Sequence, residues 1–159
     1  MNLEWDELLS VNGPSIFLVS ARERDIDIFS QRTPKNKNVI RLIRGKNCQT
    51  KDGLLNEFSS ALQFPYYFGK NWDAFDECIT DLSWLKNNNF ILFITNANLL
   101  LKCGDPKELE TFLEILKTAA NFWQKKGTFK VVFQEEKEVN PQLEATSEKR
   151  TLTPFDKIK

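Results

Sequence analysis

Apolar residues along this chain fall into two patterns, short runs of strand length and longer stretches with helical spacing. The runs at residues 39–43, 90–94 and 129–133 have the length of β-strands, and the second, FILFI, is typical of a strand covered on both faces. Between the runs, apolar residues recur every three or four positions. Strands that alternate with helices favour parallel pairing with right-handed crossovers. We therefore expect an α/β fold with a small parallel three-stranded sheet packed with helices.

Local signals place the ends of the expected helices. The helix around Phe58 has to stop before Pro65, because a residue that precedes proline avoids the α conformation. A later helix begins at Pro106, with Asp105 as its N-cap, and Gly127 ends it. Both helices carry an apolar stripe at the spacing that packs against a sheet.

The two ends of the chain are less regular than its middle. Near the N-terminus we expect a strand over residues 15–20 and, from the alternating DIDIF at residues 25–29, a second short strand. These elements would form an N-terminal extension, residues 1–37, packed on or beside an α/β domain of residues 38–134. Residues 135–159 are polar and of mixed charge, and we interpret them as an irregular C-terminal tail.

Composition is that of an ordinary globular protein. With 159 residues, 41% of them hydrophobic and 28% charged, the chain can form one domain with a real core. Its 22 basic and 22 acidic residues cancel, so bulk charge does not attract it to nucleic acid or to a membrane. The N-terminus lacks the basic region and apolar core of a signal peptide, and a cytoplasmic location is expected. Cys48, Cys78 and Cys103 are widely spaced, which indicates reduced thiols in or near the core.

The chain contains no histidine. This excludes nucleophile–histidine pairs and histidine acid–base chemistry near neutral pH, and it removes most transition-metal sites. We expect neither a cofactor nor a metal ion. Catalysis by carboxylates alone stays open on composition.

The densest group of unusual residues is FPYYFGKNWDAFDECITDLSW, residues 64–84. Asn71 is a suitable N-cap for a helix that runs to about residue 82. One face of this helix is apolar and is expected to face the core: Trp72, Phe75, Cys78, Ile79 and Leu82. The opposite face is polar: Asp73, Asp76, Glu77, Thr80 and Asp81.

Three of these carboxylates, Asp73, Glu77 and Asp81, stand four residues apart and form a row along the helix. Such a face is commonly just solvated, and the helix dipole favours an acid at Asp73. The row as a whole is less favourable, because like charges at this spacing repel by roughly 0.2–0.5 kcal/mol per pair and Asp81 lies near the C-terminal end. The pattern predicts a cationic partner, either a Lys or Arg of another segment or a second protein.

The loop before this helix is rich in aromatic residues. Pro65 stiffens it, and Gly69 is expected to supply a turn with positive φ. Tyr66, Tyr67 and Phe68 cannot all be buried in so short a loop, and we expect two of them to pack beneath it. The remaining tyrosine would offer a flat apolar face with a hydroxyl, a side chain favoured as an interface anchor.

The stretch FPYYFGKNWDAFDECITDL resembles the signature of the barstar family, small intracellular proteins that inhibit secreted bacterial ribonucleases. The resemblance implies a three-stranded parallel sheet with packed helices and an inhibitory surface made by the helix and loop of residues 64–84. In that family, the tyrosine matched by Tyr67 lies against the nuclease site. The residues matched by Gly69 and Asn71 shape and contact the same surface.

The resemblance also implies roles for residues on the helix. The aspartate matched by Asp73 meets nuclease arginines, the anchor that enters the phosphate-binding site is matched by Glu77, and Thr80 matches the threonine beside it. This chain departs from the family at Glu77, which is a methylene longer than aspartate, and at Asp76, where an aromatic residue often stands. We count Asp76 with the binding surface. An acidic residue that some members carry on the last helix falls at Phe122.

Three functions are consistent with these residues. The first is a protein inhibitor of a basic secreted ribonuclease, or an immunity protein against a nuclease toxin, which would be a monomer when free and not an enzyme. The second is an interaction module with a non-nuclease partner, and the third is a carboxylate-based hydrolase that uses Asp73 and Glu77. We favour the inhibitor, because carboxylates and tyrosines can occupy an arginine- and lysine-lined site as mimics of phosphate and base.

Overall fold

One parallel sheet of five strands runs through the part of the chain that the computed structural model describes, which is residues 3–35, 37–138 and 140–155. The strands lie side by side in the order β2-β3-β4-β1-β5. Their bounds are β1 (Ile16–Ser20), β2 (Val39–Arg44), β3 (Asn89–Thr95), β4 (Thr128–Glu135) and β5 (Glu148–Thr151).

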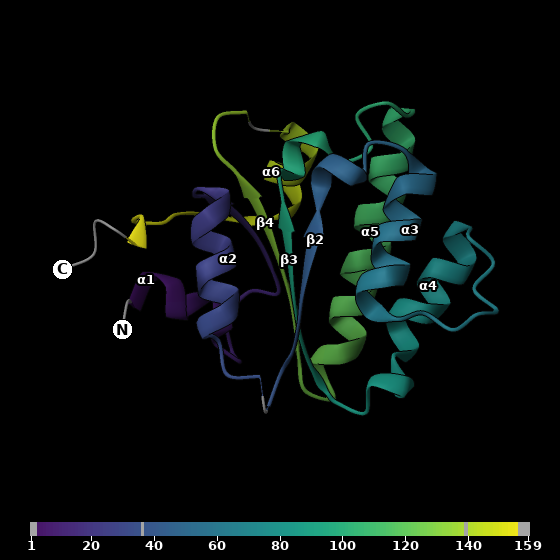
Figure 1. Ribbon diagram of the computed structural model, residues 1–159, viewed down its shortest axis with the longest axis horizontal. Helices are drawn as coiled ribbons and strands as arrows, with labels where there is room; N and C mark the ends of the chain where they lie inside the picture. The colour runs from purple at the N-terminus through teal and green to yellow at the C-terminus, as the bar shows by residue number, and fades with distance from the viewer. Residues whose placement is uncertain (1–2, 36, 139, 156–159) are drawn as a thin grey trace.

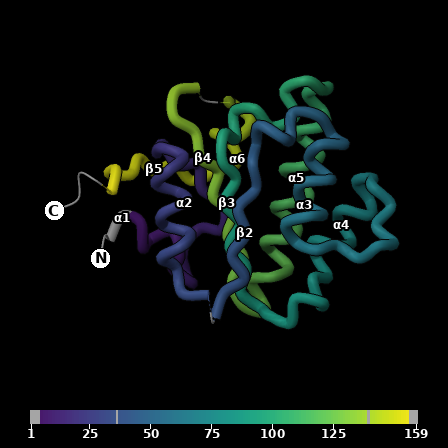
Figure 2. The backbone as a smooth tube through the Cα atoms, in the orientation of Figure 1, coloured from purple at the N-terminus to yellow at the C-terminus, as the bar shows by residue number. Residues whose placement is uncertain are grey.

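Helices cover both faces of this sheet (Figure 1). One face carries α2 (Glu23–Arg32), with the short α1 (Leu3–Asp6) beside it. The other carries α3 (Lys51–Leu62), α5 (Pro106–Gln124) and, farthest out, α4 (Trp72–Asp81). In chain order the tube of Figure 2 passes from β4 to α6 (Pro141–Thr146) and then to β5. No helix in the described ranges is both long and apolar enough to cross a bilayer.

The three strands expected in the middle of the chain are confirmed as β2, β3 and β4, but the sheet has five strands and not three. β1 pairs with β4, with Phe17 beside Val132, and β5 pairs with the other side of β1, with Leu18 beside Lys149. The segment before residue 38 thus supplies an interior strand. No local pattern encodes this arrangement, because parallel pairing joins segments that are far apart in the sequence.

The strand predicted at residues 25–29 is wrong, because these residues are the middle of α2. The buried residues of α2 have the spacing of one helix face: Asp25, Ile26, Phe29 and Ser30. An alternation only five residues long fits a strand or a helix, and packing against the sheet decides for the helix.

Asp25 is charged and yet only 1% exposed. Arg22 donates from Nε and Nη2 to its two carboxylate oxygens at 2.7 and 3.2 Å, and the N–H of Phe155 donates to Oδ1 at 3.2 Å. Burial by itself raises the pKa of Asp25, but these hydrogen bonds outweigh burial and the pKa lies below its ordinary value. The carboxylate thereby joins α2 to the C-terminal segment.

The C-terminal segment, expected to be irregular, contains α6 and β5. Asn140 caps α6 by accepting the N–H of Gln142 at 2.8 Å, and Leu143 is fully buried. The sequence of β5 is EKRT, and it contains no apolar residue from which a strand could be predicted. Its pairing with β1 is a backbone interaction, and charged side chains on such an edge also oppose pairing with other chains.

The sheet separates two apolar cores. The larger one lies beneath α3, α4 and α5, and the smaller one, which includes Phe17, lies beneath α2. In the smaller core, Trp5 stacks on Phe155 with ring centroids 4.7 Å apart, and its Nε1 donates to the carbonyl oxygen of Thr153 at 2.9 Å. The two ends of the described chain therefore meet on the α2 face.

Replacing Phe17 tests whether β1 is an integral strand. The side chain is fully buried, so Phe17→Ala should lower the free energy of unfolding by about 3–5 kcal/mol, measured by urea denaturation. Val11, which is 73% exposed, provides the control, and Val11→Ala should change that free energy by less than about 0.5 kcal/mol. Equal effects of the two substitutions would contradict the interior position of β1.

The buried Asp25 predicts a pH-dependent stability. Because its pKa is lowered on folding, its contribution is present above the ordinary value of 3.8 and is lost as the pH falls through the folded-state value. Asp25→Asn should therefore lower the free energy of unfolding by about 1.5–3 kcal/mol at neutral pH. Urea titrations in an acid series should show the gap to wild type closing below pH 3.8. Asp27→Asn, an exposed change on the same helix, should show no such convergence.

Candidate protein-binding surface

α4 forms where the sequence predicts it. The Oδ1 of Asn71 accepts the N–H of Ala74 at 2.8 Å, and the helix ends at Leu82, which adopts the left-handed conformation with φ of 47°. The side chains that α4 buries belong to the predicted apolar face: Phe75, Cys78 and Ile79. The face predicted to be polar is consequently turned away from the core.

Two tryptophans fasten α4 to α5 through their indole N–H groups. Trp72 donates to the Oε2 of Glu108 at 2.6 Å, and Trp123 donates to the carbonyl oxygen of Ile79 at 2.9 Å. No local signal identifies Glu108 as a partner of Trp72, because the two lie 36 residues apart. These bonds attach the first residue and the last turn of α4 to the long helix beneath it, so the polar face has a fixed orientation.

The polar face of α4 carries its acids into solvent. Asp73, Glu77 and Asp81 are exposed, and Asp76 is half-buried. Within the described residues, no Lys or Arg forms a salt bridge with any of these four carboxylates. The described part of the chain therefore does not supply the cationic partner that the row predicts.

Thr80 and Asn71 use their side chains inside the protein. The Oγ1 of Thr80 donates to the carbonyl oxygen of Asp76 at 2.8 Å, one turn earlier in α4. The Nδ2 of Asn71 donates to the carbonyl oxygen of Gly69 at 3.4 Å, in addition to the cap. Both side chains therefore stabilise the helix or its entry.

The loop before α4 exposes two tyrosines. Tyr66 is 101% exposed and Tyr67 is 67% exposed, and their rings meet edge to face with centroids 5.9 Å apart. Only Phe68 packs inward, against Phe64 with centroids 5.0 Å apart, so the expectation that two of the three aromatic residues lie beneath the loop is wrong. Phe64 already fills the space there, together with Trp84.

The turn with positive φ falls at Lys70, whose φ is 52°, and not at Gly69 as expected. The absence of a side chain at Gly69 instead leaves room for the amide of Asn71. A Cβ at this position would lie 3.3 Å from the Nδ2 of Asn71 and would crowd the amide that caps α4. Gly69 therefore supports the shape of the surface without contacting a partner through a side chain.

The cysteine on the inner side of α4 is free and buried. Burial raises the pKa of the Cys78 thiol, and the carboxylates of Glu77 and Asp81 raise it further. Burial also raises the pKa of Cys48 to about 12. All three cysteines are free, as expected, but Cys103 is exposed rather than in the core.

Metal binding and paired-carboxylate catalysis each require a specific arrangement of side chains. No group of three or more metal-ligating side chains in the described ranges could hold a metal ion. Paired acid–base catalysis requires two environments that separate the proton affinities of the two carboxyl groups. Asp73 and Glu77 share the same solvent-facing side of α4.

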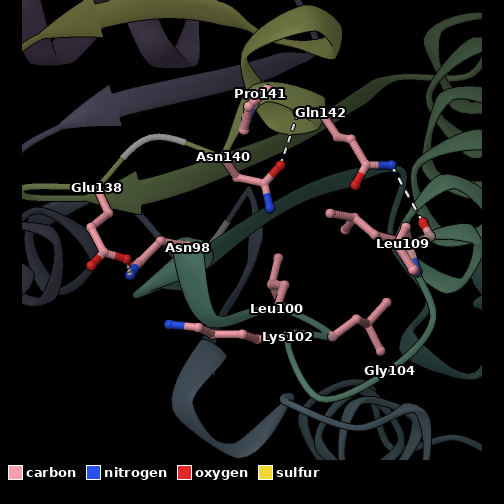
Figure 3. A pocket seen from close by; sticks show the side chains of 11 residues that line it. Asn98, Leu100, Lys102, Gly104, Leu109, Glu138, Asn140, Pro141 and Gln142 are labelled. Carbon is pink, nitrogen blue, oxygen red and sulfur yellow. Dashed lines mark hydrogen bonds between the residues drawn. The ribbon is translucent and has the colours of Figure 1, made fainter.

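The hollow drawn in Figure 3 is separate from this surface. It has a volume of about 320 Å³ and lies between the connection from β3 to α5 and the start of α6, with Leu100 and Leu109 among its lining. Gln142 extends across it and donates from Nε2 to the carbonyl oxygen of Pro106 at 3.4 Å (Figure 3). None of its lining residues belongs to α4 or to the loop before it.

Phe122 gives the end of α5 an apolar and cationic character. It is 39% exposed, and the Nζ of Lys126 lies 4.6 Å from the centre of its ring. A partner with a cationic group placed to bind a carboxylate at this position would face a positive charge instead.

The cap at Asn71 can be tested separately from any contact with a partner. Asn71→Ala removes the acceptor for the Ala74 N–H and should lower the free energy of unfolding by about 1 kcal/mol. Asn71→Asp keeps an acceptor and adds a charge that the helix N-terminus favours, so it should preserve stability. Chemical denaturation of both variants provides the measurement, and equal losses would show that the cap does not stabilise α4.

Comparison with known proteins identifies the family. The family model described as Barstar (barnase inhibitor) matches residues 38–134, which is more than half of the chain. No curated protein matches the chain. Among solved structures, the ORC2 protein of Aeropyrum pernix, described in ADPNP–ADP complexes, superposes with a TM-score of 0.56 at 12% identity. The alignment covers 96% of this chain but only 45% of that one, so the likeness concerns the fold alone. By the match over residues 38–134, the chain belongs to the barstar family.

Proposed function

We propose that this protein inhibits a ribonuclease by placing the acidic face of α4 and the tyrosines of the preceding loop over the site where the enzyme binds RNA. One observation carries the proposal. Four carboxylates gather on a fixed helix, and none of them forms a salt bridge within the described part of the chain. Membership of the family described as barnase inhibitors supports a ribonuclease as the partner.

The charges on α4 suit the site of an enzyme that binds a polyanion. Such a site is lined with Arg and Lys, and carboxylates accept charge-assisted hydrogen bonds from both. Asp73 and Glu77 are four residues apart on α4, so their Cβ atoms lie about 5–6 Å from each other. A single cationic site can therefore engage both carboxylates at once, in the places of two RNA oxygens.

The two tyrosines suit the part of the site that receives a base. Aromatic rings stack on bases and on arginine side chains, and an exposed tyrosine is a frequent anchor of protein interfaces. Tyr66 and Tyr67 lie outside a loop whose inner side is filled by Phe64 and Phe68. The packed inner side limits the freedom of the loop that presents the tyrosines.

The attachment of α4 to α5 favours tight binding. Association is weakened when side chains and loops have to be ordered at the interface. Here the Asn71 cap and the indole hydrogen bonds of Trp72 and Trp123 already fix the helix. The backbone positions of the acids are thus fixed before the partner arrives.

We further propose that the partner is a basic secreted ribonuclease or a nuclease toxin, and that the inhibitor acts as a monomer in the cytoplasm. Free thiols at Cys48, Cys78 and Cys103 are compatible with a reducing compartment. Glu77, Asp76 and the Phe122–Lys126 pair distinguish this surface from the usual family pattern. We expect these differences to favour a nuclease whose cationic site is deeper than that of the usual target, or whose charges are arranged differently.

Neutral replacements on α4 test the proposal. Inhibition of RNA cleavage and the dissociation constant should be measured with a panel of small basic ribonucleases that includes barnase. Asp73→Asn and Glu77→Gln should each weaken binding by about tenfold to a hundredfold, the equivalent of one lost charge-assisted hydrogen bond. Binding should also weaken as salt is raised to the physiological range, because charge steers the encounter.

Asp27→Asn, an exposed change on the opposite face of the sheet, provides the matched control and should leave binding unchanged. Glu77→Asp measures the effect of side-chain length and should shift preference among the nucleases of the panel. If no ribonuclease binds the wild-type protein, the nuclease partner is wrong. Retention of another protein by the same surface would then favour the interaction module.

A further inference from the structure

The carboxyl ends of β1 and β4 form the point at which the sheet changes its direction of winding. The connection that follows β1 leads to α2 on one face, whereas the connection that follows β4 leads to α6 on the other. In open α/β sheets, ligands bind in the crevice outside the carboxyl ends of strands at such a point. A hollow of about 300 Å³ lies here, lined by residues of three neighbouring strands and of the segment after β4: Leu18, Ser20, Glu135, Glu136, Lys137, Lys149, Arg150 and Thr151.

A buried carboxyl group lies in the floor of this hollow. Glu135, the last residue of β4, is only 5% exposed. Its Oε2 is fully buried and has no hydrogen-bond partner among the described residues. Burial raises the pKa of Glu135 above its ordinary value, Lys149 opposes this rise, and Glu144 adds to it. Native proteins rarely leave a buried polar atom without a hydrogen bond. We therefore expect a donor from outside the chain to bind Oε2 of Glu135.

Positive charge lies at the rim of the hollow. Lys149 belongs to β5, and its Nζ lies 3.5 Å from the Oε1 of Glu144 in an exposed pair that can rearrange. Lys137 is exposed on the segment after β4. Arg150 points elsewhere, because its guanidinium lies near the carboxylate of Glu7 and over the ring of Phe17 on the opposite face. The residues that line the hollow therefore include one buried carboxyl group and two exposed ammonium groups.

An anionic phosphate does not suit this arrangement. Phosphate crevices at this position use a glycine-rich turn with free N–H groups, but the turn after β1 reads Ala21-Arg22-Glu23. The N–H of Ala21 donates to the carbonyl oxygen of Glu135 at 3.1 Å, and the N–H groups of Asp25 and Ile26 donate to that of Arg22 at 3.0 and 3.3 Å. A carboxyl floor would also repel a phosphate.

We propose that this hollow binds a small zwitterion of the size of a free amino acid, with its ammonium group on Glu135 and its carboxylate on Lys149. The ammonium supplies the donors that the buried oxygen lacks, and the carboxylate takes the place of Glu144 beside the lysine. None of the lining residues belongs to α4 or to the loop before it, so the site is independent of ribonuclease inhibition. Binding weakens as acid protonates Glu135, because a neutral carboxyl group attracts an ammonium less.

The experiment titrates the full chain with each common amino acid and with two half-ligands, ethylamine and acetate, by calorimetry and by NMR shifts. Inorganic phosphate provides the anionic counter-probe. We expect at least one amino acid to bind more tightly than ethylamine, and acetate and phosphate to leave Glu135 unperturbed. Glu135→Gln should weaken amino-acid binding at least tenfold, the usual effect of losing one charge-assisted hydrogen bond. The matched control Glu110→Gln, an exposed carboxylate of α5 that does not line the hollow, should not.

A second variant separates the two ends of the ligand. Lys149→Met should weaken binding of the amino acid but not of ethylamine, and because Lys149 is exposed this change should not prevent folding. The proposal is overturned if neither amino acids nor ethylamine bind the wild-type protein, if phosphate binds instead, or if Glu135→Gln and Lys149→Met both leave the affinity unchanged. Ribonuclease binding by Glu135→Gln should equal that of wild type, so the two proposals can fail separately.

Discussion

The strand on which the rest of the structure depends is β4, whose eight residues are all buried. It pairs with β3 on one side and with β1 on the other, and its two faces contribute to both apolar cores. Even its Lys130 is 2% exposed, with Nζ donating to the carbonyl oxygen of Gly13 at 3.0 Å just before β1. A strand buried on both faces needs helices on both sides, which explains why α2 and the two chain ends cover the face opposite α5.

Because the two cores lie beneath the helices, the outer side of α4 is not packed against either of them. The helix buries three residues and is held by a cap and by indole hydrogen bonds from Trp72 and Trp123. Its carboxylates can therefore repel one another without unfolding the helix, since the inward contacts compensate. Under the proposed inhibitor function, the repulsion among these carboxylates would be relieved when the cationic groups of a partner approach them.

Two regions with opposite characters result. α4 and its loop present exposed acids and two exposed tyrosines, which form the surface proposed to meet a ribonuclease. The crevice at the ends of β1, β4 and β5 is small and combines a buried carboxyl group with lysines, which suits a small molecule. The family match ends at residue 134, one position before the buried Glu135, and does not include β1 or β5. The crevice is thus formed largely by segments outside the matched range.

The sequence by itself determined the elements whose signals are local. The strands β2, β3 and β4 follow from apolar runs, and α4 and α5 follow from helical periodicity with Asn71 and Asp105 as caps. These signals depend on neighbours within one or two turns. The same reasoning placed the acids of α4 on one face, because helical geometry alone decides which residues share a side.

Only the tertiary structure decided the features that depend on distant segments. The interior position of β1, the strand made from EKRT and the contact between Trp72 and Glu108 each join residues that are far apart in the sequence. The exposure of both tyrosines depends on whether Phe64 has already filled the space beneath the loop. Residues 25–29 are helical because one face of α2 packs against the sheet. A five-residue pattern does not contain this long-range contact.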